Sequence, residues 1–255
     1  MLSRLGWARS RRKRKPLPPS VLAVLESRVA YYRLLPPSEQ QELRGMLQVL
    51  LGEVSFEPGA GLERVEDEMR ILIAAQASVL LLHRPLRDLP DLRTVIVYPG
   101  VYQARERLHT DEGVEFEADE ERFGEAWAHG VLLFSWEDVV YDAEHIDDAQ
   151  NIVFHEVAHT LDEQNRAAEG IPLLLDGDLG SRWEPIFGSA FEQHQRAVRR
   201  RRRTRLDEYG AEDRAEFFAV ATEAFLEDAV AFRGAYPQLY DLLRDFYHLD
   251  PAAFA

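Results

Sequence analysis

The stretch that most constrains the fold is Asn151 to Asp162, which reads NIVFHEVAHTLD. It places His155 and His159 four residues apart, with Glu156 directly after the first histidine. Residues four apart lie on one face of an α-helix, so both imidazole rings can reach the same metal ion. Glu156 is then placed to take a proton from a water at that metal. The stretch therefore predicts a helix that carries a zinc site.

We expect this helix to lie inside the protein. Its other side chains are almost all apolar, which leaves no face suited to water: Ile152, Val153, Phe154, Val157, Ala158 and Leu161. Asp147 and Gln150 resemble a capping box, which would start the helix near them. Histidines and a glutamate in a buried helix need polar partners, and a metal ion supplies them. The alternative is a pair of core histidines that hydrogen bond to other groups.

A catalytic zinc site needs a third protein ligand and an open position. The chain has no cysteine, so this ligand must offer nitrogen or oxygen. Asp162 and Asn165 stand where the longer pattern H-E-x-x-H-x-x-G-x-x-H requires glycine and histidine, which excludes that pattern. Glu163 is one turn beyond His159, and its carboxylate would be carried past the metal along the helix axis. The third ligand should therefore come from another helix.

Glu216 is the preferred third ligand. It lies in AEFFAVATEAF, a second strongly apolar segment, where a lone carboxylate needs a partner. The alternative is an exposed first turn, in which the helix N-terminus stabilises the negative charge. Glu223, two turns further on, is placed to orient a ligand histidine through its second ring nitrogen. Asp162 is the alternative for that orienting role.

Composition and charge limit the domain organisation and the partners. With 255 residues, 46% of them hydrophobic, the chain can form one large domain with its own core. Residues 1–15 carry seven basic side chains and no acid, so a net charge of −15 for the chain becomes −22 for the remainder. So acidic a surface argues against direct nucleic-acid binding. We expect a basic mobile tail over residues 1–20 and a single domain over residues 21–255.

The sequence gives no sign of a membrane protein or a secreted one. The longest charge-free apolar run near the centre, Ile71 to Leu82, has the length of a buried helix. A secretory signal has an apolar region directly after its basic N-terminal residues, and here no such region follows them. The absence of cysteine fits a reducing compartment. We therefore expect a cytoplasmic protein without a membrane partner.

The pattern of elements predicts an α+β fold. Apolar residues recur at helical spacing over Val21–Leu51 and Glu66–Leu82, and helices dominate after residue 150. Thr94–Tyr98, Gly113–Ala118 and Val131–Trp136 have the β-branched or alternating character of strands. We expect a helical N-terminal part, a small and mostly antiparallel sheet, and a helical zinc core. The strand before the metal helix is placed to hold an extended substrate by main-chain pairing.

An arginine-rich run, RAVRRRRRTR, occupies residues 196–205. A solvated basic helix end is the first interpretation, because cations are favourable at a helix C-terminus. A protease-sensitive loop and an anionic docking site are the other two, and the sequence does not choose among them.

Two motifs in fixed order resemble a known family. HEVAHTLD, followed by YGAEDRAEFFAVATEAF, is similar to the Mlc titration factor A family of bacterial zinc peptidases. DEMRILIAAQASVLLL, TVIVYPG and GEAWAHGVLLFSWEDV extend the similarity to nearly everything from about Leu34 onward. The resemblance implies a zincin-like domain of the gluzincin type, with a core similar to the catalytic domain of anthrax lethal factor.

The resemblance also implies roles for individual residues. His155, His159 and Glu216 match the family's zinc ligands, Glu156 its catalytic glutamate, and Tyr209 a tyrosine that assists the reaction. The chain departs from the family in its arginine run and its basic N-terminus.

The family further implies aminopeptidase-like hydrolysis of small peptides and binding of the glucose repressor Mlc in enteric bacteria. The competing interpretation is a non-catalytic regulatory protein that sequesters a transcription repressor and keeps a structural or idle zinc site. A closed site would need a fourth protein ligand, and no further histidine has a suitable local spacing. That absence favours an open, catalytic site.

Overall fold

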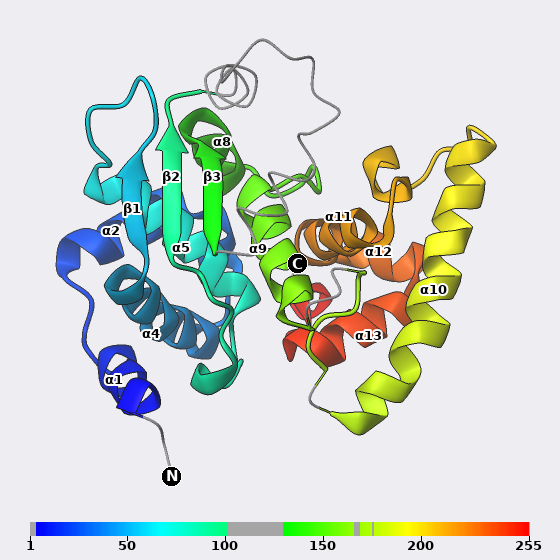
Figure 1. The fold of residues 1–255 in the computed structure, drawn as a ribbon, viewed down its shortest axis with the longest axis horizontal. Helices are drawn as coiled ribbons and strands as arrows, with labels where there is room; N and C mark the ends of the chain where they lie inside the picture. Colours follow the sequence, from blue (N-terminus) through cyan, green and yellow to red (C-terminus); the bar gives the residue numbers. More distant parts are fainter. Residues whose placement is uncertain (1–3, 101–129, 166–168, 175, 255) are drawn as a thin grey trace.

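The computed structural model describes residues 4–100, 130–165, 169–174 and 176–254. The predicted strand at Gly113–Ala118 lies outside these residues. Helices, with η for 3-10 turns, dominate the fold (Figure 1). The elements are α1 Arg4–Lys13, α2 Pro19–Arg28, α3 Ala30–Leu34, α4 Pro37–Glu53, β1 Ser55–Pro58, α5 Asp67–Leu80, η1 Leu86–Asp88, β2 Thr94–Tyr98, β3 Val131–Ser135, α8 Trp136–Glu144, α9 Ile152–Asp162, η2 Glu163–Asn165, α10 Gly177–Arg199, η3 Glu208–Ala211, α11 Arg214–Glu227, α12 Ala229–Ala235, α13 Pro237–Tyr247 and η4 Pro251–Ala253.

The described sheet has three strands in the order β1-β2-β3, and both pairs are parallel. Ser55 is opposite Thr94, and Thr94 is opposite Val131. The prediction of an α+β fold is confirmed, but the prediction of a mostly antiparallel sheet is wrong for these strands. Parallel neighbours need a long crossover connection, and α5 provides it between β1 and β2. Alternation along a strand reveals which face is buried and not which way its neighbour runs.

Helix α9 lies between two parts of the molecule. The sheet with α4, α5 and α8 forms one part, and α10 to α13 form the other (Figure 1). Helix α9 contacts α5 on one side and α11 on the other. Phe154, Val157 and Leu161 are fully or almost fully buried, as the apolar pattern predicted. None of the described helices is long and apolar enough to cross a membrane.

Residues 4–13, which we expected in a mobile tail, form α1 and pack on α4. Arg9 pairs with Glu53 at 2.9 Å, and Lys13 pairs with Glu42. Gly45 of α4 permits the close approach, because a Cβ there would lie 2.7 Å from the Lys13 Cγ. Ion pairs and a close backbone contact thus hold this segment, so no apolar periodicity marked it in the sequence.

Candidate metal centre

The predicted ligands meet where α9 packs against α11. His155 and His159 lie one turn apart on α9, and Glu216 lies in the first turn of α11. The Nε2 atoms of the two histidines are 3.1 Å apart. The Glu216 Oε2 atom lies 3.0 Å from the His155 Nε2 and 3.5 Å from the His159 Nε2. The fold therefore brings together, from two helices, three side chains able to hold one metal ion.

The three donor atoms have the separations that a tetrahedral metal ion requires. Metal–ligand bonds of about 2.0–2.1 Å place neighbouring donors of a tetrahedron about 3.3 Å apart, and the separations here are 3.0, 3.1 and 3.5 Å. The side chains of His155, His159 and Glu216 expose 14%, 4% and 13% of their surface. Two imidazole nitrogens and a carboxylate oxygen that converge in such a place need a positive charge among them, and a metal ion supplies it. Among the residues that the structure describes, the donor set thus fits a metal with one position left open to solvent or substrate.

Glu223 fixes the orientation of His155. Its Oε1 atom lies 2.7 Å from the His155 Nδ1, so that ring nitrogen donates the hydrogen bond. The Nε2 lone pair then points at Glu216 and His159, as a metal ligand requires. Burial would lower the pKa of His155, but hydrogen bonds with Glu216 and Glu223 outweigh it and raise the pKa to about 10. The carboxylates thus make this point of the protein attractive to positive charge.

The pKa of Glu216 is shifted in the opposite direction from that of His155. Burial raises its pKa, but hydrogen bonds from His155 and His159 more than compensate and lower the pKa to about 2. The α11 N-cap residue Asp213 accepts a hydrogen bond from the Glu216 backbone N–H at 2.9 Å. Glu216 therefore occupies the first turn of its helix, as the alternative interpretation expected. That interpretation also required a side chain exposed to solvent, whereas only 13% of the Glu216 side-chain surface is accessible and it faces the two histidines.

A network at the start of α9 was missed by sequence reasoning. The helix begins after Asn151, whose Oδ1 atom accepts from the Phe154 N–H at 3.0 Å, and not at the predicted Asp147–Gln150 box. The Asn151 N–H donates to Glu223 at 2.6 Å, so the residue that orients His155 also holds the cap. An asparagine directly before an apolar helix was the available signal.

Further carboxylates surround the same cap. The Asp142 Oδ2 atom accepts from the Ile152 N–H at 2.7 Å, and the Asn151 side-chain amide donates to Glu227 at 3.1 Å. Burial raises the pKa of Asp142 to about 7 and that of Glu227 to about 9. Three acidic side chains thus gather at the N-terminus of the helix that carries the histidines, and two of them hold their protons more tightly than a free carboxyl group does.

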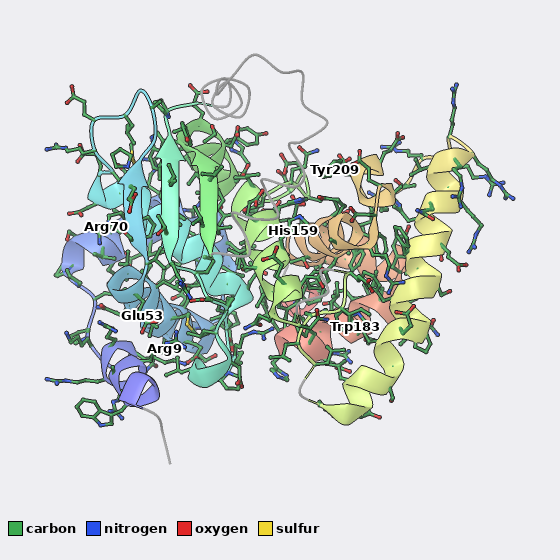
Figure 2. All side chains as sticks on the ribbon, viewed as in Figure 1. Arg9, Glu53, Arg70, His159, Trp183 and Tyr209 are labelled. Atoms are coloured by element: carbon green, nitrogen blue, oxygen red, sulfur yellow. The ribbon has the colours of Figure 1, made fainter. Side chains whose placement is uncertain are left out.

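Tyr209 and Glu156 lie at the edge of this site. Tyr209, on η3, is 46% exposed, and its side chain lies close enough to Glu216 for that carboxylate to affect its pKa. Its ring centroid is 6.1 Å from that of His155. Burial and the neighbouring Glu216 raise the pKa of Tyr209 above its ordinary value, which keeps the hydroxyl protonated. Glu156 is half-buried beside His155. Figure 2 shows His159 and Tyr209 in the region between α9 and the C-terminal helices.

Asp162 and Glu163 are not among the three converging donors, although both lie near enough to His159 to interact with it electrostatically. The Asp162 Oδ2 atom accepts from the Gly170 N–H at 2.8 Å and so fixes the segment that follows α9. Glu223, the other candidate for orienting a ligand histidine, is the carboxylate that contacts His155. Glu163 lies in η2, beyond the end of α9, and is not part of the three-residue group.

Sequence comparison places the chain in a family. The model of the glucose-regulated metallo-peptidase M90 family matches residues 5–248. The chain belongs to this family. The match includes α1, which supports the view that this helix is part of the domain. A metal-dependent peptidase family and a compact His-His-Glu group are thus two independent indications of a metal centre.

Relatives of this M90 family member agree with the resemblance that the motifs suggested. An uncharacterized protein of Synechocystis sp. (strain ATCC 27184 / PCC 6803 / Kazusa) is 36% identical over 97% of this chain and 90% of its own length. The Mlc titration factor A of Pectobacterium atrosepticum is 29% identical over 86% of this chain and 82% of its own. The Mlc titration factor A of Serratia proteamaculans is 27% identical over 86% of this chain and 85% of its own length.

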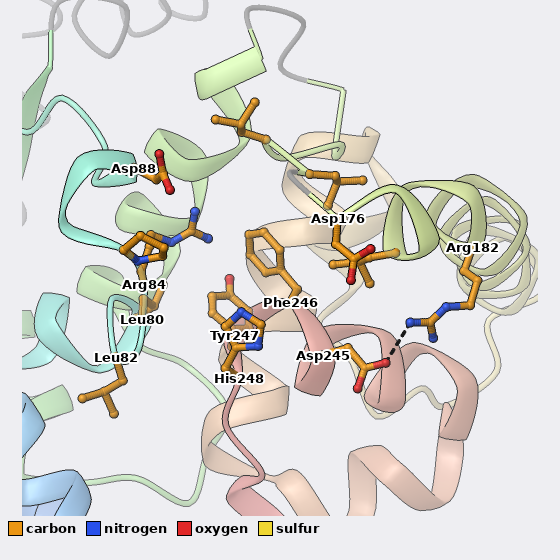
Figure 3. A pocket seen from close by; sticks show the side chains of 14 residues that line it. Leu80, Leu82, Arg84, Asp88, Asp176, Arg182, Asp245, Phe246, Tyr247 and His248 are labelled. Carbon is orange, nitrogen blue, oxygen red and sulfur yellow. Dashed lines mark hydrogen bonds and ion pairs between the residues drawn. The ribbon is translucent and has the colours of Figure 1, made fainter. Parts of the chain in front are cut away.

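A hollow of about 510 Å³ lies away from the metal centre of this M90 family member (Figure 3). The end of α5, the start of α10 and the end of α13 surround it. The Arg84 guanidinium lies over the Phe246 ring at 4.8 Å, and Arg182 pairs with Asp245 at 2.9 Å. None of the three metal-site residues lines this hollow, so it is not the place where the metal would act.

Proposed function

We propose that this protein is a zinc-dependent peptidase that hydrolyses peptide bonds, with His155, His159 and Glu216 as the zinc ligands. The convergence of two imidazole nitrogens and one carboxylate oxygen within 3.0–3.5 Å carries the proposal. Zinc is the metal of choice because a cysteine-free set of two histidines and one glutamate, with a position left open, is a catalytic zinc arrangement. Membership of a metallo-peptidase family supports the reaction class.

A zinc ion held by these residues would act as a Lewis acid that polarises the scissile carbonyl and lowers the pKa of a nearby water. Glu156 follows a ligand histidine directly, so its carboxylate serves as the base that removes a proton from the attacking water. The same carboxyl group then delivers that proton to the departing amine. Glu223 holds the His155 ring in place through the 2.7 Å hydrogen bond to Nδ1.

Tyr209 contributes to the transition state. Its hydroxyl is protonated, and its side chain lies near Glu216 at the edge of the metal site. When substrate is bound, this hydroxyl can turn to donate to the carbonyl oxygen as that oxygen gains negative charge. β3, an edge strand of the sheet in its described part, offers main-chain groups for an extended substrate. The family resemblance supports an aminopeptidase-like action on small peptides, and the absence of cysteine fits a reducing compartment such as the cytoplasm.

A regulatory binding protein is the second candidate function. The curated relatives from Pectobacterium and Serratia are named Mlc titration factor A, which supports an interaction with an Mlc-like transcription repressor. In this alternative the zinc site is structural or idle and the repressor is sequestered by a surface of the protein. The two functions are compatible, because only the first requires Glu156 and Tyr209 to act.

Metal analysis combined with kinetics tests the proposal. We expect one zinc per chain in the wild type, and a large loss of zinc in His155→Ala, His159→Ala and Glu216→Ala, because each change leaves only two protein ligands. Glu156→Gln should keep its zinc while peptide turnover falls by about two orders of magnitude or more. Tyr209→Phe should keep its zinc and lower kcat with little change in KM.

Glu163→Gln is the matched control, because it removes a carboxylate close to the metal helix but outside the three-residue group. It should keep both zinc and turnover. Full zinc content in Glu216→Ala would move the third ligand to another residue. Wild-type turnover in both Glu156→Gln and Tyr209→Phe would leave the repressor-binding function as the better explanation.

A further inference from the structure

Five consecutive arginines, Arg199 to Arg203, form an exposed turn at the end of α10, here called the arginine turn. Their neighbours have acidic partners, since Arg196 pairs with Glu192 at 3.0 Å and Arg205 with Asp228 at 3.8 Å. Throughout the part of the chain that the structure describes, no carboxylate forms an ion pair with any of the five. In a protein of net charge −15, five consecutive arginines without an ion pair in the described residues are unexpected.

The backbone of the arginine turn is also strained, in addition to the repulsion among its like charges. The Arg202 N–H donates to the Ala197 carbonyl at 2.9 Å and the Arg201 N–H to the Val198 carbonyl at 2.8 Å, which together form a Schellman motif. The residue at its left-handed position is Arg201, with φ of 51°. Glycine is the usual residue there, and a side chain costs about 1–2 kcal/mol. The turn therefore keeps an arginine where both strain and like-charge repulsion disfavour it.

The arginine turn lies at the end of a helix that is tied to the segment carrying Tyr209. The His194 ring donates from Nε2 to the Asp207 carbonyl at 3.0 Å, and the Gln195 side chain donates to the Ala211 carbonyl at 3.1 Å. These two bonds tie the end of α10 to η3, the element that carries Tyr209. Arg203 and Tyr209 are six residues apart, so their Cα atoms are at most about 21 Å apart. In Figure 2 this end of α10 and Tyr209 lie along the same edge of the molecule.

We propose that the arginine turn is a docking site for an acidic segment of the polypeptide that the metal centre cleaves. This inference rests on the peptidase function proposed above and adds the substrate class. Guanidinium groups bind carboxylates through paired hydrogen bonds and long-range attraction. The five arginines lie within a helix end and a single turn of chain, so a short acidic segment of a few residues can reach several of them.

The surroundings of the turn favour an acidic peptide over a nucleic acid. Removing the five positive charges from a net of −15 leaves −20 on the rest of the protein. Asp207, Glu208 and Glu212, all exposed, follow within a few residues. A duplex carries one charge per about 1.7 Å along its axis, so it would extend from the turn onto this acidic surface. A peptide can confine its carboxylates to the length of the turn.

Fluorescence anisotropy tests the docking site. The probes are two labelled 16-residue peptides, identical except that a block of four residues at one end is glutamate in one and glutamine in the other. The full-length chain carries Glu156→Gln so that the peptides are not consumed. In about 50 mM NaCl the glutamate peptide should bind about ten-fold more tightly, and in about 300 mM NaCl the preference should nearly disappear.

Two triple variants with equal changes of charge locate the preference. Arg200→Gln, Arg202→Gln and Arg203→Gln together should reduce it to about two-fold or less. The control combines Arg11→Gln, Arg14→Gln and Lys15→Gln, which alter exposed cations on or next to α1, at the other side of the molecule in Figure 1, and should keep the ten-fold preference. Equal losses in both variants would overturn the proposal, because net charge alone would then explain binding. Tighter binding of a single-stranded oligonucleotide than of the glutamate peptide at this turn would also overturn it.

Turnover by the same variants, built without Glu156→Gln, separates this inference from the proposed function. The arginine-turn variant should raise KM about ten-fold for the glutamate peptide and leave the glutamine peptide unchanged. If turnover does not depend on the arginines, the proposed docking site is refuted and the proposed peptidase function still stands. The expected binding pattern with no turnover in any chain would retain an acidic-segment docking site and refute its link to catalysis.

Discussion

Replacing Glu227 by glutamine should stabilise the protein at neutral pH. Burial is the main cause of the rise in the pKa of Glu227 from 4.5 to about 9. The folded protein therefore keeps this proton up to about pH 9, whereas the unfolded chain releases it near pH 4.5. The stability that this group contributes is complete below pH 4.5 and is lost progressively as the pH rises toward 9. Glutamine cannot ionise, so the variant escapes that loss.

The magnitude follows from the same pKa difference. One pKa unit corresponds to about 1.36 kcal/mol, and the interval from pH 4.5 to pH 7 gives at most about 3.4 kcal/mol. Solvent at this half-buried side chain lowers the effect, so we expect on the order of 2 kcal/mol at pH 7. The glutamine oxygen can still accept the hydrogen bond that Asn151 now donates to the Glu227 Oε1 atom. For a chain of this length the change corresponds to a rise in Tm of about 4–8 °C.

Thermal and urea unfolding of chelator-treated protein at pH 4.5, 6, 7 and 8 would measure the effect without interference from metal loss. The difference between Glu227→Gln and wild type should be near zero at pH 4.5 and should grow with pH. Glu26→Gln, on the exposed side of α2, is the control and should show no such trend. A difference that does not change with pH, or a variant less stable than wild type at pH 7, would refute the reasoning.

Three further predictions concern stability. Asn151→Ala removes the cap of α9 and its side-chain bonds to Gln76 and Glu227, and should lower the free energy of unfolding by about 2 kcal/mol in urea; an unchanged value would show that Asp142 suffices as the cap. Deleting residues 1–15 should lower Tm by about 2–5 °C, because α1 is ion-paired to α4; an unchanged Tm would favour the mobile tail. Arg201→Gly should raise Tm by about 1–3 °C by relieving its left-handed backbone, whereas Arg202→Gly should not.

Local patterns in the sequence determined much of the metal helix. The four-residue spacing of His155 and His159 fixes their common face on any α-helix, whatever packs around it. The apolar residues between them made that helix a buried one, and the structure agrees. The N-cap of this helix was harder to predict from the sequence, because Asp147 and Asn151 are both good capping residues. In the fold, α9 starts after Asn151, and the Asn151 N–H hydrogen bonds to Glu223, 72 residues away in the chain.

Only the tertiary structure decided which distant groups meet. Glu216 was the preferred third ligand from its apolar setting, but its 3.0 Å approach to His155 depends on how α11 packs against α9. The same packing selects Glu223 over Asp162 as the partner of the His155 Nδ1 atom. Strand direction likewise follows from the crossover through α5, and the place of α1 from ion pairs with α4. Each is a contact between segments far apart in the chain, whereas sequence periodicity describes only the face that a segment presents.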